Sequence, residues 1–226
     1  MHADGWIHTA KMAFFVALGF CPFRERVSSR ESTGMVSNPT HQPFICREEK
    51  VMLKGKSITL RLVQETDLDQ LYTFHLDIDN RGNYFPRGVL SQPAFRKEFQ
   101  ETGFWSKEDG MLVMVSPNDD ILGHIEFFKT VNYLDEFELS YVVYPAEQRG
   151  KGIATEAINL LVRYLFETKR VNRIRLVIHP ENLASRRLAE KCGFRHEGTA
   201  RGAWYNKGKH QDVEIYAILH DDVIIA

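Results

Sequence analysis

A strand, a glycine-containing loop and a helix follow one another in the second half of the chain, and this unit limits the fold more than any other segment. The apolar run 139–144 ends at a proline, and apolar residues recur at helical spacing over 157–166. Between the two segments, Gly150 and Gly152 lie in the turn. The first N–H groups of a helix lack backbone partners and carry about half a positive charge, and glycines let a phosphate oxygen come close. The segment therefore predicts a loop that binds a pyrophosphate group.

Two common nucleotide-binding motifs do not fit this loop. A Walker loop ends in Gly-Lys-Ser or Gly-Lys-Thr, whereas Lys151 is followed by a glycine, and a dinucleotide loop needs a third glycine where Thr155 stands. The loop does contain Arg-x-x-Gly-x-Ala, formed by Arg149, Gly152 and Ala154. A turn with no chemical role is the alternative that the loop alone leaves open.

The overall composition gives no indication of a nucleic-acid or membrane partner. The chain has 226 residues, of which 43% are hydrophobic and 26% charged, as in soluble globular proteins, and its formal net charge is -1. The three cysteines, Cys21, Cys46 and Cys192, are widely spaced, and neither a Cys-x-x-Cys pair nor a His-Glu-x-x-His motif is present. We therefore predict a protein of the reducing cytoplasm without a metal site.

The first 51 residues differ in character from the rest. Residues 12–23 form an apolar run shorter than the roughly 20 residues of a membrane-spanning helix, and no small-x-small cleavage site follows them. Residues 28–43 are rich in Ser, Thr, Asn and Pro, as linkers are. We predict that residues 1–51 are an extension that the fold does not need, with Met52 as a candidate native start, and that residues 52–226 form one domain.

The remaining segments carry strand and helix patterns in turn. Apolar alternation predicts strands, and capping residues predict helix starts, among them Thr66 with its acidic first turn and Ser91 followed by Pro93. The predicted strands cover 58–62, 111–115, 121–128, 137–143 and 173–179 with a final hairpin in 203–218, and the predicted helices cover 66–75, 91–105, 157–166 and 182–192. The strands on either side of the third helix should be parallel neighbours joined by a right-handed crossover.

A family resemblance becomes specific in the last helix. It opens with Asn-x-x-Ser, at Asn182 and Ser185, and ends in Lys-Cys-Gly-Phe. With the preceding loop and strands, this order resembles the GCN5-related N-acetyltransferases over residues 52–220, and within them the RimJ and RimL branch, which acetylates the N-termini of ribosomal proteins. The segments most similar to that branch are 190–194, 197–198 and 212–216. The resemblance implies a three-layer α+β fold whose mixed, mostly antiparallel sheet has six to seven strands, about four flanking helices and a splay between its two central parallel strands.

The resemblance also implies a site for acetyl-CoA, in the gap between the strand that ends near Val143 and the strand that starts near Arg173. Backbone groups of the first strand would pair with the pantetheine amides, and the loop N–H groups would bind the pyrophosphate. The residues implied for coenzyme binding are Tyr141, Val142, Val143, Gln148, Arg149, Gly150, Lys151, Gly152, Ile153, Ala154, Thr155, Asn182 and Ser185. For the two basic residues the alternative is a solvated loop, and for Asn182 it is a plain helix N-cap.

Acetyl transfer to an amine needs a group that protonates the departing thiolate and a group that takes the amine proton. Many family members supply the first from a Tyr seven residues after the Asn, where this chain has Ala189. Ser185, which matches the Asn-x-x-Ser of RimL-like enzymes, is our substitute candidate, with a capping hydroxyl as its alternative. Glu138 and Glu126 are candidate bases or structural strand residues, since the carboxylate of RimL-type enzymes falls on Trp204 here. An α-amine, with a pKa of about 8, needs a base less than a lysine, with a pKa of about 10.4.

Five aromatic residues are predicted to line the pocket for the acceptor amine: Tyr84, Phe85, Trp105, Phe128 and Trp204. Flat apolar walls suit a peptide end and a small-molecule amine equally well. Given the resemblance to the RimJ and RimL branch, we expect an enzyme that acetylates a protein or peptide N-terminal α-amine by direct attack in a ternary complex. A homodimer is compatible with this expectation.

Two alternatives stay open. One is an acetyltransferase for a small-molecule amine, such as an antibiotic or a polyamine. A polyamine calls for an acidic pocket, and the only group of acidic residues that stands out is Asp67, Asp69, Asp77 and Asp79. The other alternative is a non-catalytic acyl-CoA sensor, because the usual tyrosine acid is missing.

Overall fold

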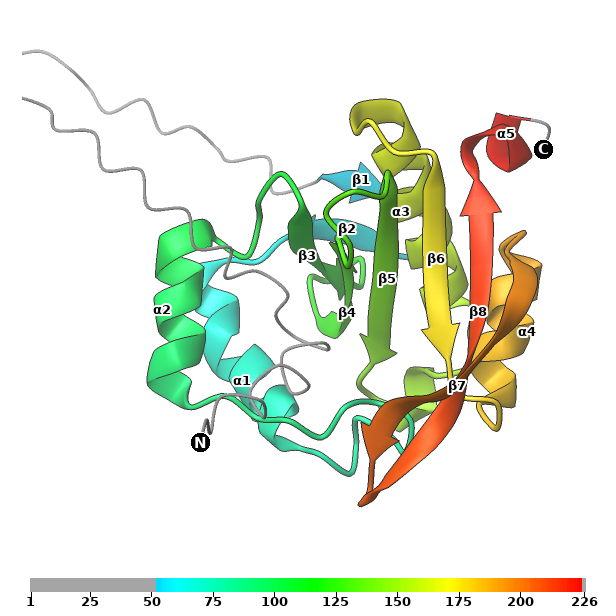
Figure 1. Cartoon of the computed structure of the whole chain (residues 1–226). Helices are drawn as coiled ribbons and strands as arrows, with labels where there is room; N and C mark the ends of the chain where they lie inside the picture. Colours follow the sequence, from blue (N-terminus) through cyan, green and yellow to red (C-terminus); the bar gives the residue numbers. More distant parts are fainter. Residues whose placement is uncertain (1–51, 225–226) are drawn as a thin grey trace, which may run out of the picture.

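An eight-stranded sheet with helices on both faces runs through residues 52–224, the part of the chain that the computed structural model describes (Figure 1). The strand order is β1-β2-β3-β4-β5-β6-β8-β7, and all neighbours are antiparallel except β5 and β6, which are parallel. The predicted mixed, mostly antiparallel sheet is confirmed, and the two-residue strand β1 takes the number of strands beyond the expected six to seven. The predicted extension, residues 1–51, lies outside the described residues.

The elements follow one another much as the sequence predicts. The strands are β1 (Leu53–Lys54), β2 (Thr59–Leu62), β3 (Asp109–Val115), β4 (Ile121–Phe128), β5 (Glu136–Val143), β6 (Arg173–Ile178), β7 (Arg195–Asn206) and β8 (Lys209–Leu219). The helices are α1 (Leu68–Leu76), α2 (Gln92–Thr102), α3 (Ile153–Thr168), α4 (Leu183–Lys191) and α5 (His220–Ile224), with short 3-10 turns η2 (Glu65–Asp67) and η3 (Ala146–Gln148). Within the described residues, no helix has the length and apolar character needed to cross a membrane.

The sheet opens between its two parallel strands. β5 and β6 pair only at their first residues, and the last pair in register is Glu138 with Arg175. Beyond that pair, β5 stays with β4 up to Val143, while β6 stays with β8 up to Ile178. The two strands therefore diverge toward their carboxyl ends, which confirms the predicted splay.

Each face of the sheet carries its own hydrophobic core. On one face, α3 buries Ala157, Leu161 and Leu165 completely, at the spacing of an amphipathic helix. On the other face, Leu71 of α1 and Phe95 of α2 are completely buried against β3 and β4 (Figure 1). Because side chains alternate along a strand, successive residues of β4 and β5 belong to different faces. The face to which a residue points therefore decides which part of the molecule it can contact.

Two element boundaries differ from the sequence prediction for identifiable reasons. The first helix is preceded by a 3-10 turn, because Asp67 turns inward and binds Arg61 at 2.6 Å. This pair buries Arg61 in β2 and leaves Leu62 at 43% exposure, against the predicted apolar alternation. The second helix ends at Thr102, since Gly103 adopts a left-handed backbone (φ 63°), and Trp105 therefore lies beyond the helix.

Candidate active site

The loop between β5 and α3 leaves backbone N–H groups unused. Gly150 (φ 76°) and Gly152 (φ 86°) adopt the left-handed conformation that favours glycine, and open space surrounds both. The first N–H of α3 with a backbone acceptor is that of Glu156, which donates to the Gly152 carbonyl at 2.9 Å. No backbone carbonyl of the described residues accepts a hydrogen bond from the N–H groups of the three residues that precede Glu156. Lys151 donates to the Gln148 side chain at 3.2 Å and adds positive charge, so the loop fits a pyrophosphate.

Backbone groups of β5 point alternately toward β4 and into the gap. The N–H of Tyr144 donates to the carbonyl of Leu122, a residue of β4, at 2.9 Å. Val142 lies two residues earlier, so its backbone also faces β4. The residues whose backbone groups face the gap are Leu139, Tyr141 and Val143. An amide-bearing chain laid in the gap would meet these groups as an additional strand would.

Arg149 directs its guanidinium toward the protein itself. Its Nε donates to the Val143 carbonyl at 2.9 Å, and one terminal nitrogen donates to the carbonyls of Asn80 (2.5 Å) and Tyr144 (3.2 Å). The Val143 carbonyl is therefore occupied, and of the three β5 residues predicted for the coenzyme, Tyr141 offers the best placed free backbone groups. Arg149 also connects the glycine loop to the loop between α1 and α2.

Asn182 and Ser185 lie at the start of α4, where Ser185 approaches a buried tyrosine. The side-chain oxygen of Asn182 accepts from the Ser185 N–H at 3.2 Å, which is the N-cap arrangement. Burial raises the pKa of Tyr141 to about 12, and contact with the Ser185 side chain acts in the opposite direction. No hydrogen bond of standard geometry reaches the Tyr141 hydroxyl from the described residues. Two neutral hydroxyls thus lie close together without being bonded.

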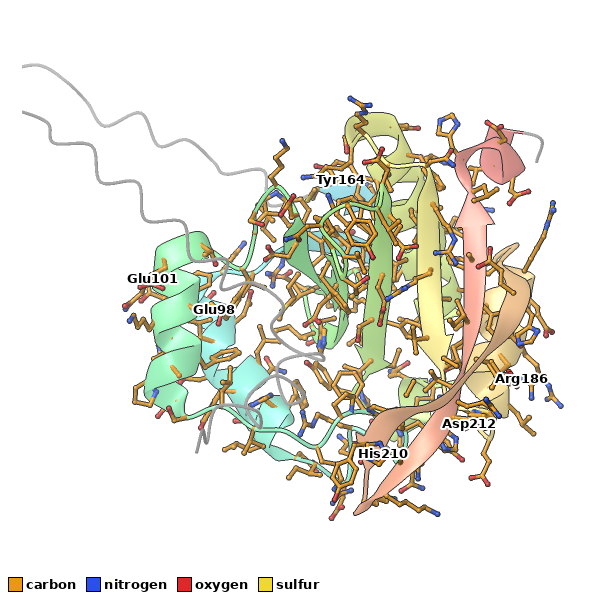
Figure 2. The ribbon with its side chains drawn as sticks, viewed as in Figure 1. Glu98, Glu101, Tyr164, Arg186, His210 and Asp212 are labelled. Atoms are coloured by element: carbon orange, nitrogen blue, oxygen red, sulfur yellow. The ribbon has the colours of Figure 1, made fainter. Side chains whose placement is uncertain are left out.

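Glu126 of β4 belongs to a buried group that we call the histidine cluster, formed by His124, Glu126 and Tyr144. His124 contacts the Tyr144 hydroxyl through Nδ1 at 2.5 Å, and its Nε2 lies 3.4 Å from Oε1 of Glu126, an oxygen with no hydrogen bond. Burial raises the pKa of Glu126 well above its ordinary value, and Glu98 of α2 (Figure 2) and Asp109 add to the rise. Burial also lowers the pKa of His124 to about 3. The cluster therefore places a carboxyl of raised pKa beside a neutral imidazole.

Glu138 belongs to a different group, the ion-pair cluster, formed by Glu136, Glu138, Arg173 and Arg175 at the point where β5 and β6 separate. Arg175 contacts Glu138 at 2.9 Å and Glu136 at 3.0 Å, and Arg173 also pairs with Glu136. Burial raises the pKa of Glu138, while its bonds to Arg175 lower it. Of the two glutamates predicted as bases, Glu138 is engaged in ion pairs and Glu126 is not.

Most of the predicted acceptor-side aromatics gather around two histidines. Tyr84 stacks on His179 at 4.8 Å between ring centroids, and Trp204 meets the same imidazole edge-on at 5.9 Å. Phe85 meets His124 edge-on at 6.3 Å. The loop before α2, the end of β6 and the strand β7 thus contribute to one aromatic wall.

The two other aromatics lie apart from this wall. Phe128 ends β4 opposite Glu138, next to the ion-pair cluster. Trp105 packs against Phe127 and against Tyr164 of α3, which Figure 2 labels, so it faces the core on the opposite side of the sheet. Its position follows from the end of α2 at Gly103. The structure therefore separates Trp105 from the other four predicted pocket residues.

Several residues of the site were not singled out from the sequence. His124 stands two positions before Glu126 on one strand, and this spacing places both on one face. That signal was present in the sequence. His179, Tyr144 and Arg81 reach the site through tertiary contacts, for which no local pattern exists.

The similarity to known proteins agrees with this geometry. Residues 57–195 match the family model of the acetyltransferase (GNAT) domain. A probable N-acetyltransferase of Bacillus subtilis, YjcK, is 30% identical over 182 residues, which cover 76% of this chain and 98% of that protein. The [ribosomal protein uS5]-alanine N-acetyltransferase of Escherichia coli is 24% identical over 186 residues, with coverage of 76% and 93%. The crystal structure of Vibrio cholerae spermidine N-acetyltransferase with CoA and spermine superimposes with a TM-score of 0.64 at 21% identity, with coverage of 74% and 98%.

This chain belongs to the GNAT acetyltransferase family. It is an N-acetyltransferase, and its acetyl donor is acetyl-CoA. The relative that acts on a ribosomal protein is in line with the predicted RimJ and RimL branch. The open strand pair, the unused N–H groups before α3 and the cap at Asn182 fit the coenzyme.

Proposed function

We propose that the enzyme acetylates the N-terminal α-amine of a protein or peptide in the cytoplasm. The observation that carries this proposal is the pairing of the acidic residues beside the acceptor loop. Three of the four aspartates that favoured a polyamine each have an arginine partner: Asp67 with Arg61 (2.6 Å), Asp69 with Arg96 (2.5 Å) and Asp79 with Arg87 (3.7 Å). The fourth, Asp77, accepts from the N–H of Asn80 at 3.0 Å. These carboxylates are therefore poorly suited to bind the several cations of a polyamine.

The rest of the acceptor side supports a substrate with a single amine. The two buried glutamates of the ion-pair cluster are neutralised by arginines, and Glu126 has no Lys or Arg partner among the described residues. The pocket beside Tyr84 and His179 is lined by Lys207 and Lys209 and by one carboxylate, Glu181, so the charge of its lining is positive and disfavours a polycation. A site with one buried carboxyl, that of Glu126, suits an acceptor with one amine.

The described side chains account for both proton transfers. Bound acetyl-CoA supplies a thioester carbonyl that a neutral amine attacks. Glu126 accepts the amine proton, and its raised pKa makes its carboxylate a stronger base than an exposed glutamate. His124, whose Nε2 lies 3.4 Å from this carboxyl, stays neutral and positions it. On the opposite face of the sheet, one of the neighbouring hydroxyls of Ser185 and Tyr141 donates a proton to the departing thiolate.

Mass spectrometry of reaction products tests the proposal. The full chain is incubated with acetyl-CoA and four acceptors: a peptide with a free α-amine and no lysine, the same peptide with a blocked N-terminus and one lysine, spermidine, and an aminoglycoside. We expect acetylation of the free α-amine peptide and at least tenfold slower reaction with the other three.

A faster reaction with spermidine or the aminoglycoside would replace the proposal with a small-amine acetyltransferase. Acetylation of the internal lysine at the rate of the α-amine would remove the preference for N-termini. Release of free thiol in each reaction, measured in parallel, separates transfer to the acceptor from hydrolysis of the donor.

A further inference from the structure

Arg81, in the loop between α1 and α2, is a buried cation that forms no ion pair with any carboxylate of the described residues. It is 6% exposed, its terminal nitrogen donates to the Gly88 carbonyl at 3.2 Å, and its Nε makes no hydrogen bond. Arginines normally enter a protein interior only with paired charges, because an isolated ion loses its hydration without compensation.

The buried Arg61 and the half-buried Arg175 follow the usual rule. Arg61, at 3% exposure, binds Asp67 and Asp119 at 2.6 and 3.0 Å. Arg175 binds the two glutamates of the ion-pair cluster. On the same loop as Arg81, Arg87 is more exposed and lies 3.7 Å from Asp79. Arg81 therefore differs both from buried arginines elsewhere and from its exposed neighbour.

The surroundings of Arg81 place it next to the histidine cluster. Its guanidinium lies over the ring of Phe85 at 5.7 Å, and Phe85 in turn meets His124. Burial lowers the pKa of Arg81, while the nearby Tyr144 and Asp77, which forms no ion pair with it, act against this. Arg81 also lowers the pKa of His124, so the two are within electrostatic range. His124 thus contacts Glu126 and feels the charge of Arg81, with the Phe85 ring near both His124 and Arg81.

The loop holds Arg81 in place. The preceding residue, Asn80, is bound by Arg149 at 2.5 Å, and Asn83 accepts a bond from Lys207 at 2.9 Å. Arg81 itself bonds the Gly88 carbonyl at the other end of the loop. The guanidinium is therefore fixed in orientation, which suits a planar, two-pronged partner such as a carboxylate.

We propose that Arg81 binds a carboxylate of the acceptor whose amine reacts beside Glu126. This inference rests on the proposed function and names a class of acceptor within it. The carboxylate has two possible sources: an acidic side chain close to the N-terminus of a peptide, or the α-carboxylate of a free amino acid. Both place an anion a short distance from the reacting amine.

Paired acceptors separate the two sources. Peptides without lysine and with an amidated C-terminus carry Asp or Asn at position 1, 2 or 3, and free amino acids are compared with their amides. Affinity is measured by calorimetry without acetyl-CoA, and kcat/KM is measured with it. We expect one carboxylate acceptor to bind about tenfold or more tightly than its amide, the effect of a charge-assisted bond.

Substitutions assign the preference to Arg81. In Arg81→Met the favoured carboxylate acceptor should bind no better than its amide, and the melting temperature should be unchanged or higher, because an unpaired buried charge is removed. Arg81→Lys should keep a reduced preference for the carboxylate acceptor, since lysine retains the positive charge but lacks the paired N–H donors of a planar guanidinium. Arg87→Met, on the same loop, should keep the preference in full.

Equal affinity of the wild-type protein for every carboxylate and its amide would overturn the inference, whatever the variants do. A preference that survives in Arg81→Met would overturn it as well. If the wild type prefers a carboxylate ligand in calorimetry but acetylates none of the α-amines, the inference stands and the proposed function fails.

Discussion

Two groups of buried polar side chains lie on the same face of the sheet, and they differ in whether their charges are paired. In the ion-pair cluster each glutamate contacts an arginine, and Arg175 also bonds Thr130 at 2.9 Å. In the histidine cluster, Oε1 of Glu126 makes no hydrogen bond, and the nearby Arg81 has no carboxylate partner among the described residues.

The difference separates structural from chemical roles. Folding selects for satisfied buried groups, because each unsatisfied one costs about 1–3 kcal/mol. Among the described residues, Oε1 of Glu126 accepts no hydrogen bond and Arg81 forms no ion pair, and both findings are explained if substrates complete these two groups. The ion-pair cluster then keeps the two parallel strands together where they start to diverge. The histidine cluster instead takes part in the reaction of the bound acceptor amine.

The strongest test of this distinction is the pair Glu126→Gln and Glu138→Gln. Glu126→Gln should lower kcat about 10²- to 10⁴-fold, the usual value of a general base, with the unfolding free energy unchanged or higher. Glu138→Gln should lower stability and retain most of the turnover of the folded fraction. Steady-state kinetics and urea unfolding of both variants measure the two effects. If Glu138→Gln removes the activity of a stable protein, the roles are reversed.

A second test removes a charge from the ion-pair cluster. Arg175→Met leaves Glu136 and Glu138 short of a partner in a buried position, and it should lower the unfolding free energy by about 3 kcal/mol. Arg163→Met, an exposed arginine of α3, should change it by less than about 0.5 kcal/mol. A similar small change for both variants in urea titrations would show that the ion-pair cluster does not stabilise the fold.

The pH dependence of stability gives a third test. Burial lowers the pKa of His75 to about 4 and that of His124 to about 3, below the ordinary value of 6.5. The unfolded chain therefore binds protons that the folded chain does not, and each of the two histidines should lower stability by roughly 2–3 kcal/mol as the pH drops from 6.5 toward 4. Urea unfolding at a series of pH values measures this slope. A flat profile between pH 6.5 and 4 would contradict the buried neutral histidines.

The same series tests the opposite slope at higher pH. The raised pKa of Glu126 means that the folded state holds a proton above the ordinary value of 4.5, so stability should fall as the pH rises through the raised pKa. Glu126→Gln should remove this decline and leave the acid side unchanged. A decline that persists in the variant would assign it to another group.

The smallest effects are expected from removing the hydroxyl of Tyr72 or of Tyr141. The Tyr72 hydroxyl donates to the Leu90 carbonyl at 3.2 Å, whereas that of Tyr141 has only the nearby Ser185 side chain, without standard hydrogen-bond geometry, among the described residues. Tyr72→Phe should cost about 1 kcal/mol of stability without affecting turnover. Tyr141→Phe should keep stability and lower kcat about tenfold if its hydroxyl protonates the thiolate. Unchanged turnover in Tyr141→Phe would leave Ser185 as the proton donor.

Local patterns were sufficient for most of the fold. The glycine loop, the cap at Asn182 and the two hairpins are set by short-range spacing, and all of them form as predicted. The splay was implied by the family resemblance alone, because strand pairing over 30 residues leaves no local pattern. Trp105 was predicted to line the acceptor pocket, and the left-handed turn at Gly103, which no local pattern indicated, directs it toward the core under α3.

The histidine cluster was only half visible in the sequence. His124 and Glu126 share a face of one strand, but Tyr144 and Arg81 come from a following loop and from a preceding one. Whether a buried carboxyl or guanidinium has a partner depends on distances between distant segments. That information exists only in the folded chain, and it is what separates Glu126 from Glu138.

The side chain of Arg149 couples two loops of the site. One guanidinium holds the carbonyls at the end of β5 and that of Asn80, so the loop that fits the pyrophosphate and the loop that carries Arg81 share one side chain. A ligand that moves the Arg149 side chain away from the carbonyls of one loop also changes its hydrogen bond to the other loop. The dissociation constant of the amine should therefore depend on whether acetyl-CoA is bound, and by thermodynamic reciprocity the amine should change the dissociation constant of the coenzyme by the same factor.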